Sequence, residues 1–329
     1  MKRLGQIVAT LAVSAAFLYL ALRRVPPSEL WAHMQRAHLA LLALAGALHA
    51  LKFYLVGVRW GVLLDHVKRI SRPRLYPVVA ITYMANNVLP LRAGEIIRVF
   101  VLGRREGVSK SAALGSVVVE RTLDGVALLT MFLLACALTP VPAPLRSGAA
   151  LVGAALGVVV VLLFALVFAR ERALAFLHAL LRLAPARLRQ PAGLALERFV
   201  QGLNSLRSGG QVACALGLTF AHWLSEAFVY YLVACAVGAP LGYFGALFVT
   251  VVVNVGILIP ASPGYVGTFE YFATRAAMLM GAVEPLAAAY ALLSHVVIYF
   301  PITAVGLACF AAEGVSLKQA AKGQAQDSS

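Results

Sequence analysis

Charged side chains lie inside otherwise apolar stretches of this chain, where they could bind a polar or charged ligand. Arg92, Glu95 and Arg98 occupy one such stretch, and Glu95 and Arg98 would share a helix face at a spacing of i,i+3. Charges at membrane depth are costly, so they usually pair with one another or line a pathway. Their clustering therefore predicts either a buried ion network or a binding site.

Two carboxylates follow on the next apolar stretch. Glu120 and Asp124 would lie on one helix face, and two carboxylates there need a cationic partner, for which Arg92 or Arg121 is the natural candidate. Buried pairs can be retained for conformational specificity alone, so a static network that locks the helices together stays open as one interpretation. The other is that part of the network binds a phosphate or another lipid headgroup, because arginine binds phosphate bidentately and keeps its proton.

A further polar group occurs in the C-terminal half. Glu270 opens an apolar segment after a glycine-rich stretch, where a helix N-terminus would present free N–H groups. His222 and Glu226 lie at i,i+4, and His295 follows in the last apolar run. Helix–helix hydrogen bonding is the commoner role for such histidines, and proton coupling through His222 and Glu226 is the alternative. We expect no metal site and no cofactor.

Both charged groups follow the same kind of interruption of an apolar segment. The shared order is asparagine, proline break, glycine and glutamate, which are Asn87, Pro90, Gly94 and Glu95 in the first segment and Asn254, Pro260, Gly264, Gly267 and Glu270 in the second. Irregular backbone at membrane depth persists only where protein or a watery cavity satisfies it. Paired broken segments in corresponding positions therefore indicate a transporter-type binding site near the bilayer midplane, to which we assign Asn87, Asn254, Gly264 and Gly267 as well.

The amino-acid composition is that of an integral membrane protein. Of 329 residues, 61% are hydrophobic and 12% are charged, which excludes a soluble domain. The formal charge of +15 sits in loops between apolar runs, so it sets orientation and does not indicate nucleic-acid binding. Basic residues concentrate on one side, including loop 170–210, which places this loop and both termini in the cytoplasm. Arg59, near the inner end of an apolar run, is expected to extend toward the headgroups.

We predict an all-α polytopic protein whose residues 1–329 form one membrane domain. Six apolar runs are long enough to span the bilayer, near residues 4–22, 39–64, 112–139, 146–169, 211–237 and 286–312. The two broken segments, 75–103 and 240–281, would be re-entrant hairpins, and a rival layout makes each a full crossing, giving eight spans.

An internal repeat accompanies this layout. An offset of 175 residues aligns Glu95 with Glu270 and Glu120 with His295. Repeat 1 would cover about 4–139 and repeat 2 about 146–312, each with three crossings and one hairpin. An odd number of crossings between copies inverts the second one, as in inverted-repeat transporters.

The motifs resemble a known family. The residues that carry the likeness are Asn87, Pro90, Arg92, Gly94, Glu95 and Arg98, then Glu120, Arg121, Asp124 and Gly125, then Pro260, Pro263, Gly264, Gly267 and Glu270. Their spacing is similar to that of the lysylphosphatidylglycerol synthase transmembrane region family. The resemblance implies a flippase-like module with re-entrant helices and a lipid cavity at the repeat interface. Some members are fused to an aminoacyltransferase domain, which we do not expect here because the chain ends at Ser329 after a short polar tail. Tyr265 and His295 depart from the family pattern, which points to a lipid headgroup different from that of other members.

The leading hypothesis is a lipid translocase of the bacterial inner membrane that is not an enzyme. Its ligand would be an anionic or glycosylated lipid, and the resemblance implies a phospholipid, a polyprenyl-phosphate sugar or a hopanoid. No Walker motif occurs, so ATP would not drive movement directly. The alternatives are a membrane-embedded lipid glycosyl- or phosphotransferase and a non-catalytic partner that presents lipid to a separate transferase. Small residues in 149–157 would permit a homo-oligomer.

Overall fold

Long apolar helices dominate the computed structural model. It describes residues 2–65, 67–89, 93–139, 209–259 and 261–312, with short pieces between 154 and 193 that include α8 (Arg170–Leu181). Within these residues, four helices are long and apolar enough to cross a bilayer. They are α3 (Leu39–Leu64), α6 (Lys110–Leu138), α10 (Gly209–Val237) and α13 (Glu284–Ala312). The chain is therefore an all-helical, multi-pass membrane protein, as predicted.

The other two predicted spans have different outcomes. The first is helical as α1 (Lys2–Leu22), of which Thr10–Leu22 counts as a shorter apolar helix. Helix α2 (Pro27–Gln35) connects it to α3. The span predicted at 146–169 lies almost wholly outside the described residues, as does most of loop 170–210 beyond α8.

Both predicted breaks are present. The first separates α4 (Arg72–Val88) from α5 (Gly94–Glu106), and the second separates α11 (Tyr243–Gly256) from α12 (Thr268–Leu279), with the short 3-10 turn η2 (Pro263–Tyr265) between them. In the first break, the Asn86 side chain turns back to accept a hydrogen bond from the Gly94 backbone at 2.9 Å. In the second, Gly264 and Gly267 adopt φ of 74° and 90°, which glycine tolerates best.

The two breaks meet inside the bundle. Helix α4 packs against η2, and a Cβ added to Gly264 would lie 3.6 Å from the Asn87 carbonyl oxygen. The Asn87 side chain continues toward α13, where it donates to Thr303 Oγ1 at 2.8 Å. Asn87 and Gly264, predicted from separate motifs, are therefore neighbours.

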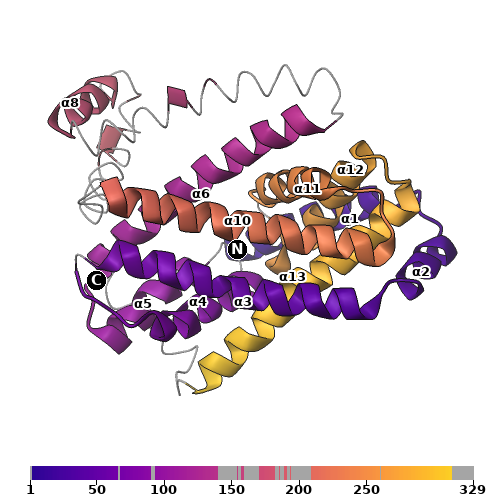
Figure 1. The fold of residues 1–329 in the computed structure, drawn as a ribbon, viewed down its shortest axis with the longest axis horizontal. Coiled ribbons are helices and arrows are strands. Elements are labelled where there is room, and N and C mark those ends of the chain that lie inside the picture. The colour runs from indigo at the N-terminus through magenta and orange to yellow at the C-terminus, as the bar shows by residue number, and fades with distance from the viewer. Residues whose placement is uncertain are drawn as a thin grey trace.

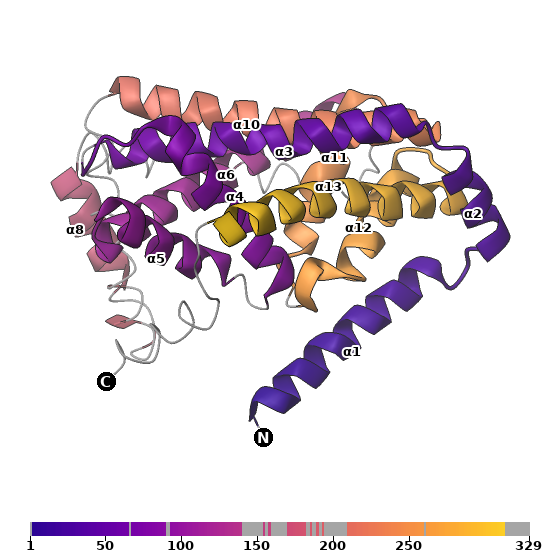
Figure 2. The same cartoon turned by 90° about the horizontal axis from the view of Figure 1, so that it is seen from below.

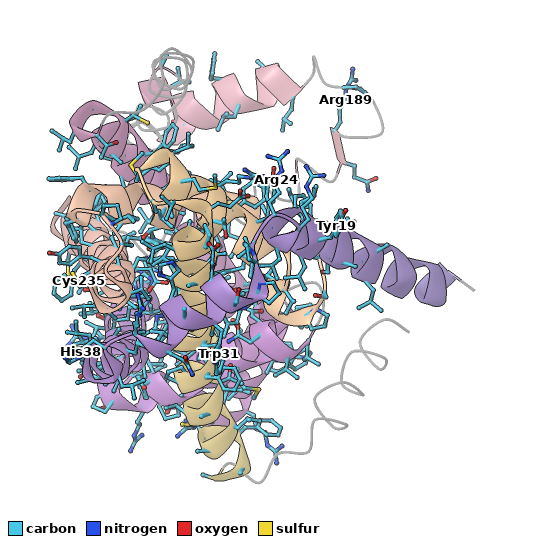
Figure 3. The ribbon with its side chains drawn as sticks, turned by 90° about the vertical axis from the view of Figure 1, so that its right-hand side faces the viewer. Tyr19, Arg24, Trp31, His38, Arg189 and Cys235 are labelled. Carbon is cyan, nitrogen blue, oxygen red and sulfur yellow. The ribbon has the colours of Figure 1, made fainter. Side chains whose placement is uncertain are left out.

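Helix α1 covers the second break from outside. Ser14 Oγ accepts from the Ser262 backbone and donates to Ser262 Oγ, both at 2.8 Å. A Cβ on Gly267 would come within 2.1 Å of the Ser14 carbonyl oxygen, so only glycine permits this approach. One turn further along α1, the Phe17 ring packs against Tyr271 and Phe272 of α12. The N-terminal part of α1 extends away from the bundle (Figure 2), and Figure 3 shows Tyr19 on α1 and Arg24 just after its end.

Helices α3 and α10 lie side by side and run in opposite directions (Figure 1). His38, at the start of α3, donates through its backbone to Ala236 near the end of α10, and Arg59 reaches Thr219 near the other end. Helix α13 packs on α4, and α6 packs on α11. These contacts bring charged residues of α3, α5, α6 and α10 next to one another.

Candidate functional site

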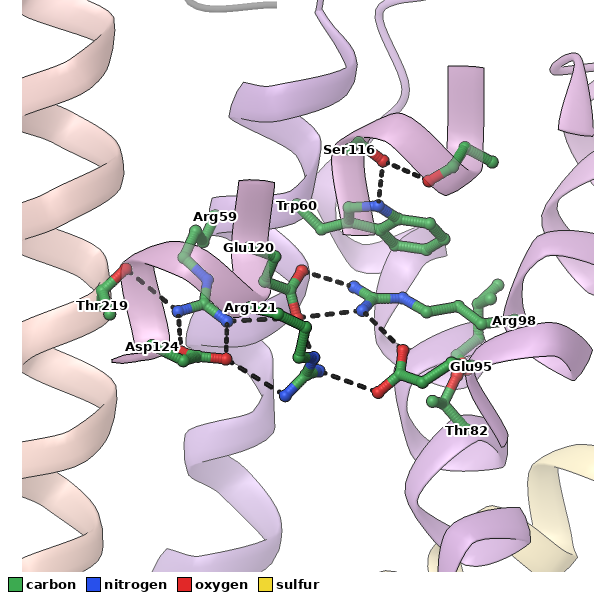
Figure 4. A network of polar contacts seen from close by, with 12 residues as sticks. Arg59, Trp60, Thr82, Glu95, Arg98, Ser116, Glu120, Arg121, Asp124 and Thr219 are labelled. Atoms are coloured by element: carbon green, nitrogen blue, oxygen red, sulfur yellow. Dashed lines mark hydrogen bonds and ion pairs between the residues drawn. The ribbon is translucent and has the colours of Figure 1, made fainter. Parts of the chain in front are cut away.

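A buried pair of Arg98 and Glu120 joins the first hairpin to α6. Arg98 donates through both terminal nitrogens to the two carboxylate oxygens of Glu120, at 2.9 and 3.0 Å, and neither residue is exposed (Figure 4). The guanidinium also stacks on the Trp60 ring at 3.7 Å, and Trp60 donates to Ser116 Oγ. This bidentate, stacked geometry fixes α5 against α3 and α6.

Arg59 does not extend to the headgroups, contrary to the prediction. It is 1% exposed and donates to Asp124 Oδ1 at 2.6 Å and to Thr219 at 3.0 Å. A second terminal nitrogen lies 3.1 Å from Glu120. The two carboxylates on α6 compensate the buried charge, so the guanidinium turns into the bundle.

Arg121 completes this arrangement. It is one of the two residues predicted as the cationic partner of Glu120 and Asp124. Its guanidinium lies 3.0 Å from Glu95, 3.1 Å from Glu120 and 3.1 Å from Asp124. Its side chain is 36% exposed, whereas Glu120 has no exposed surface. We call Arg59, Glu95, Arg98, Glu120, Arg121 and Asp124 the guanidinium network. Arg92, the other candidate partner, lies outside the described residues.

A second buried cluster joins α3 to α10. Lys52 Nζ lies 2.5 Å and His49 Nδ1 lies 3.1 Å from the same carboxylate oxygen of Glu226. We call His49, Lys52 and Glu226 the lysine cluster. His222 lies next to this cluster and packs edge-on against Trp223. Glu226 and His222 are among the predicted site residues, whereas Lys52 and His49 are not. Their signal is the spacing of His49, Lys52 and Arg59, which places three basic side chains along one face of an apolar helix.

Glu270 and His295 form a third pair, at the second break. Glu270 accepts from the Gly267 backbone at 2.6 Å and contacts His295 Nδ1, while His295 Nε2 lies 2.9 Å from the Gly264 carbonyl oxygen. A carbonyl oxygen only accepts, so Nε2 carries a hydrogen. A second hydrogen must lie between Nδ1 and the carboxylate, which makes the pair neutral as a whole. His295 thus lies with Glu270 and apart from His222 and Glu226.

A cavity of about 460 Å³ lies between these groups. Its lining includes Asn87, Glu95, Arg121 and Asp124 from the first half, and His222, Glu226 and Asn254 from the second. Lys52 and His49 also line it, and residues beside the second break, Ile257, Leu258 and Tyr265, form part of its wall. The other described candidates, Arg98, Glu120, Gly264, Gly267, Glu270 and His295, are outside this lining. These residues fix the short helices against their neighbours, whereas the cavity-lining residues face the space between the two broken segments.

No metal site emerges from the described residues. They contain no group of three or more histidine, cysteine, aspartate or glutamate side chains placed to hold an ion.

Residues 7–306 match the family described as lysylphosphatidylglycerol synthase TM region. The chain belongs to this family. The match confirms the resemblance seen in the paired motifs and covers both broken segments and all three polar groups.

Relatives include membrane proteins and one glycosyltransferase. A UPF0104 membrane protein from Methanothermobacter thermautotrophicus is 26% identical over 87% of this chain and 88% of that protein. A second UPF0104 membrane protein from the same organism is 22% identical over 97% and 98%. Glycosyltransferase AglD from Haloferax volcanii is 28% identical over 88% of this chain but only 52% of its own length. These relatives are archaeal, so placement in a bacterial inner membrane stays a prediction.

Proposed function

We propose that the protein is a lipid translocase in which a polar headgroup crosses the bilayer through the cavity while the acyl chains remain in lipid. The cavity itself carries this proposal, because charged and amide side chains from both halves line a space inside a bundle of membrane-spanning helices. Ionisable groups at membrane depth that face an internal space mark substrate or ion pathways.

An inverted repeat supports the proposal. The order long helix, two short helices, long helix occurs as α3–α6 and again as α10–α13, and α6 and α13 each have 29 residues. If α4 corresponds to α11 and α6 to α13, the contact of α4 with α13 should have a counterpart between α11 and α6. Both contacts occur. The equivalent helices α3 and α10 are antiparallel, and α5 and α12 lie toward opposite ends of the bundle (Figures 1 and 2). We infer that the second half is inverted relative to the first.

The lengths of the short helices favour re-entrant hairpins. At about 1.5 Å per residue, helices of 12 to 17 residues are shorter than the hydrocarbon core of about 30 Å. Each hairpin would enter from one side and return, so that its break lies within the membrane. The positive-inside rule then places the first hairpin and both termini on the cytoplasmic side.

The neutral pair of Glu270 and His295 supplies a candidate for proton coupling. It shares one hydrogen next to the glycines of the second break. In the first half, the glutamate that aligns with Glu270 is Glu95, and its partner on α6 is Arg121, whose guanidinium keeps its charge. We propose that protonation acts on the second hairpin only.

A second function is favoured by the match to AglD, which covers about half of that glycosyltransferase. In this alternative, the chain presents a lipid to a separate lipid-modifying transferase and does not move it. The protein itself would not be an enzyme in either case.

Reconstitution into vesicles tests the proposed function. The vesicles contain a fluorescent phospholipid and a fluorescent glycolipid in turn, and dithionite, which does not cross the bilayer, bleaches the outer leaflet. We expect bleaching to proceed to the inner-leaflet lipid when protein is present, for at least one of the two. Bleaching that stops at the outer leaflet for both, as in protein-free vesicles, would reject translocation. Lipid binding without translocation would then favour the presenting function.

A further inference from the structure

The charges of the described residues around the cavity cancel one another. The cations are Lys52, Arg59, Arg98 and Arg121, and the carboxylates are Glu95, Glu120, Asp124 and Glu226, so the described residues contribute four of each. Every one of these cations lies within 3.1 Å of at least one of the carboxylates.

Among the described residues, a phosphate entering this space would therefore meet no uncompensated cation. It would have to break an existing pair, leaving a carboxylate unpaired, or remain an extra buried charge. Either alternative is costly in a poorly solvated interior, because breaking a buried pair leaves a charge without compensation. The described arginines therefore stabilise the contacts between helices and do not serve as binding groups for an anion.

Uncharged polar groups remain available in the lining. Asn254 uses its side-chain N–H₂ to donate to Thr250, Asn87 likewise donates to Thr303, and Asn86 uses its oxygen to accept from Gly94. The described contacts leave the opposite end of each amide without a partner. Two amide oxygens and the N–H₂ group of Asn86 are therefore left, and a sugar hydroxyl can pair with either kind because it both donates and accepts.

Aromatic rings complete the lining. Phe53, Tyr83 and Trp223 come from α3, α4 and α10, while Tyr265, Phe269 and Tyr299 come from the second break and from α12 and α13. Flat apolar faces with a few polar groups between them are typical of sites for small uncharged ligands, and the volume of about 460 Å³ falls in their usual range. The hydrophobic C–H faces of a sugar ring can pack on such rings, while its hydroxyls reach the amides.

We propose that the cavity selects an uncharged sugar headgroup over an anionic phosphate headgroup. This selectivity rests on the proposed function, since it names the headgroup that enters the same cavity. Of the two predicted ligand classes, anionic lipids and glycosylated lipids, this selectivity favours glycosylated lipids.

Calorimetric titration of the purified protein tests the selectivity without any transport. The protein is held in a zwitterionic detergent that carries no sugar, and short-chain glucosyl-diacylglycerol and phosphatidylglycerol are titrated in turn. We expect the glucosyl lipid to bind about tenfold more tightly, with an affinity that does not change with salt. Tighter binding of phosphatidylglycerol, weakening as salt rises, would overturn the proposal.

Two variants separate the amide and charge contributions. Asn254→Leu should weaken glucosyl-lipid binding about three- to tenfold, the value of a lost neutral hydrogen bond, and leave phosphatidylglycerol unaffected. Glu95→Gln leaves one cation uncompensated and should raise phosphatidylglycerol affinity about tenfold with little effect on the sugar. Glu95 is 23% exposed, so the variant is expected to fold, and Glu226→Gln repeats the test at the lysine cluster.

The outcomes distinguish this proposal from the proposed function. Translocation of a phospholipid in vesicles together with preferential phosphatidylglycerol binding would reject the sugar selectivity and keep the translocase. Absence of both translocation and binding for every lipid would reject the translocase, and the selectivity with it. A Glu95→Gln variant that binds phosphatidylglycerol no better than the native protein would contradict the charge-balance argument alone.

Discussion

Replacing Glu120 by leucine is expected to lower the free energy of unfolding by about 3–5 kcal/mol. The substitution removes the carboxylate that receives Arg98 bidentately and that also lies 3.1 Å from both Arg59 and Arg121. Arg98 would then keep a buried positive charge, and the one described carboxylate still near it would be Glu95, at 3.8 Å. An uncompensated buried charge costs more than the pair itself contributes.

The loss is measured by unfolding in mixed micelles followed by helical circular dichroism. Glu106→Gln is the matched control, because Glu106 pairs with a Lys68 side chain that is 48% exposed, and such pairs contribute less than about 1 kcal/mol. The double variant Arg98→Leu with Glu120→Leu should recover part of the loss, since it removes the stranded charge. Unfolding of Glu120→Leu at the same denaturant concentration as the native protein would show that the network contributes nothing to stability.

Gly125→Phe should slow lipid translocation by about tenfold or more, because pocket volume discriminates strongly between ligands that fit and those that do not. Gly125 lines the cavity from α6, and a Cβ added there meets no atom within 4 Å. The first atom of a larger side chain therefore has open space, and we expect a phenylalanine ring at this position to occupy part of the cavity. Replacing a mid-helix glycine also favours the helix, so the protein should fold normally.

Gly217→Phe provides the control for this change. Gly217 lies in α10, is exposed, has equal space around its Cβ and does not line the cavity. It should translocate lipid at the native rate in the same vesicles. Equal slowing of both variants, or of neither, would mean that the cavity is not the path of the headgroup.

The sequence allowed prediction of the breaks and of the long helices because both leave local signals. Apolar runs placed α3, α6, α10 and α13 to within a few residues, and asparagine, proline and glycine marked where the short helices end. One of the partners considered for Glu120 and Asp124, Arg121, is in contact with both, since all three lie within one turn of α6.

The partners of α3 could not be predicted in the same way. Arg59 meets Asp124 across 65 positions and His49 meets Glu226 across 177, and these contacts depend on how α3 is rotated against α6 and α10. Hydrophobic periodicity is weak on a helix that is apolar nearly all round, so it does not set that rotation. His222 and His295 were grouped by type, but packing gives them separate neighbours, the lysine cluster for one and Glu270 for the other.

Photolabelling tests most directly whether a headgroup enters the cavity between the two breaks. One lipid carries a diazirine on its sugar headgroup, and a second carries it on an acyl chain. After irradiation in vesicles, mass spectrometry identifies the labelled peptides. We expect the headgroup probe to label Tyr83 and Asn254 in the cavity, and the acyl probe to label Phe300, which is 70% exposed on α13. A headgroup probe that labels only exposed positions such as Phe300, and never Tyr83 or Asn254, would contradict a headgroup path through the cavity.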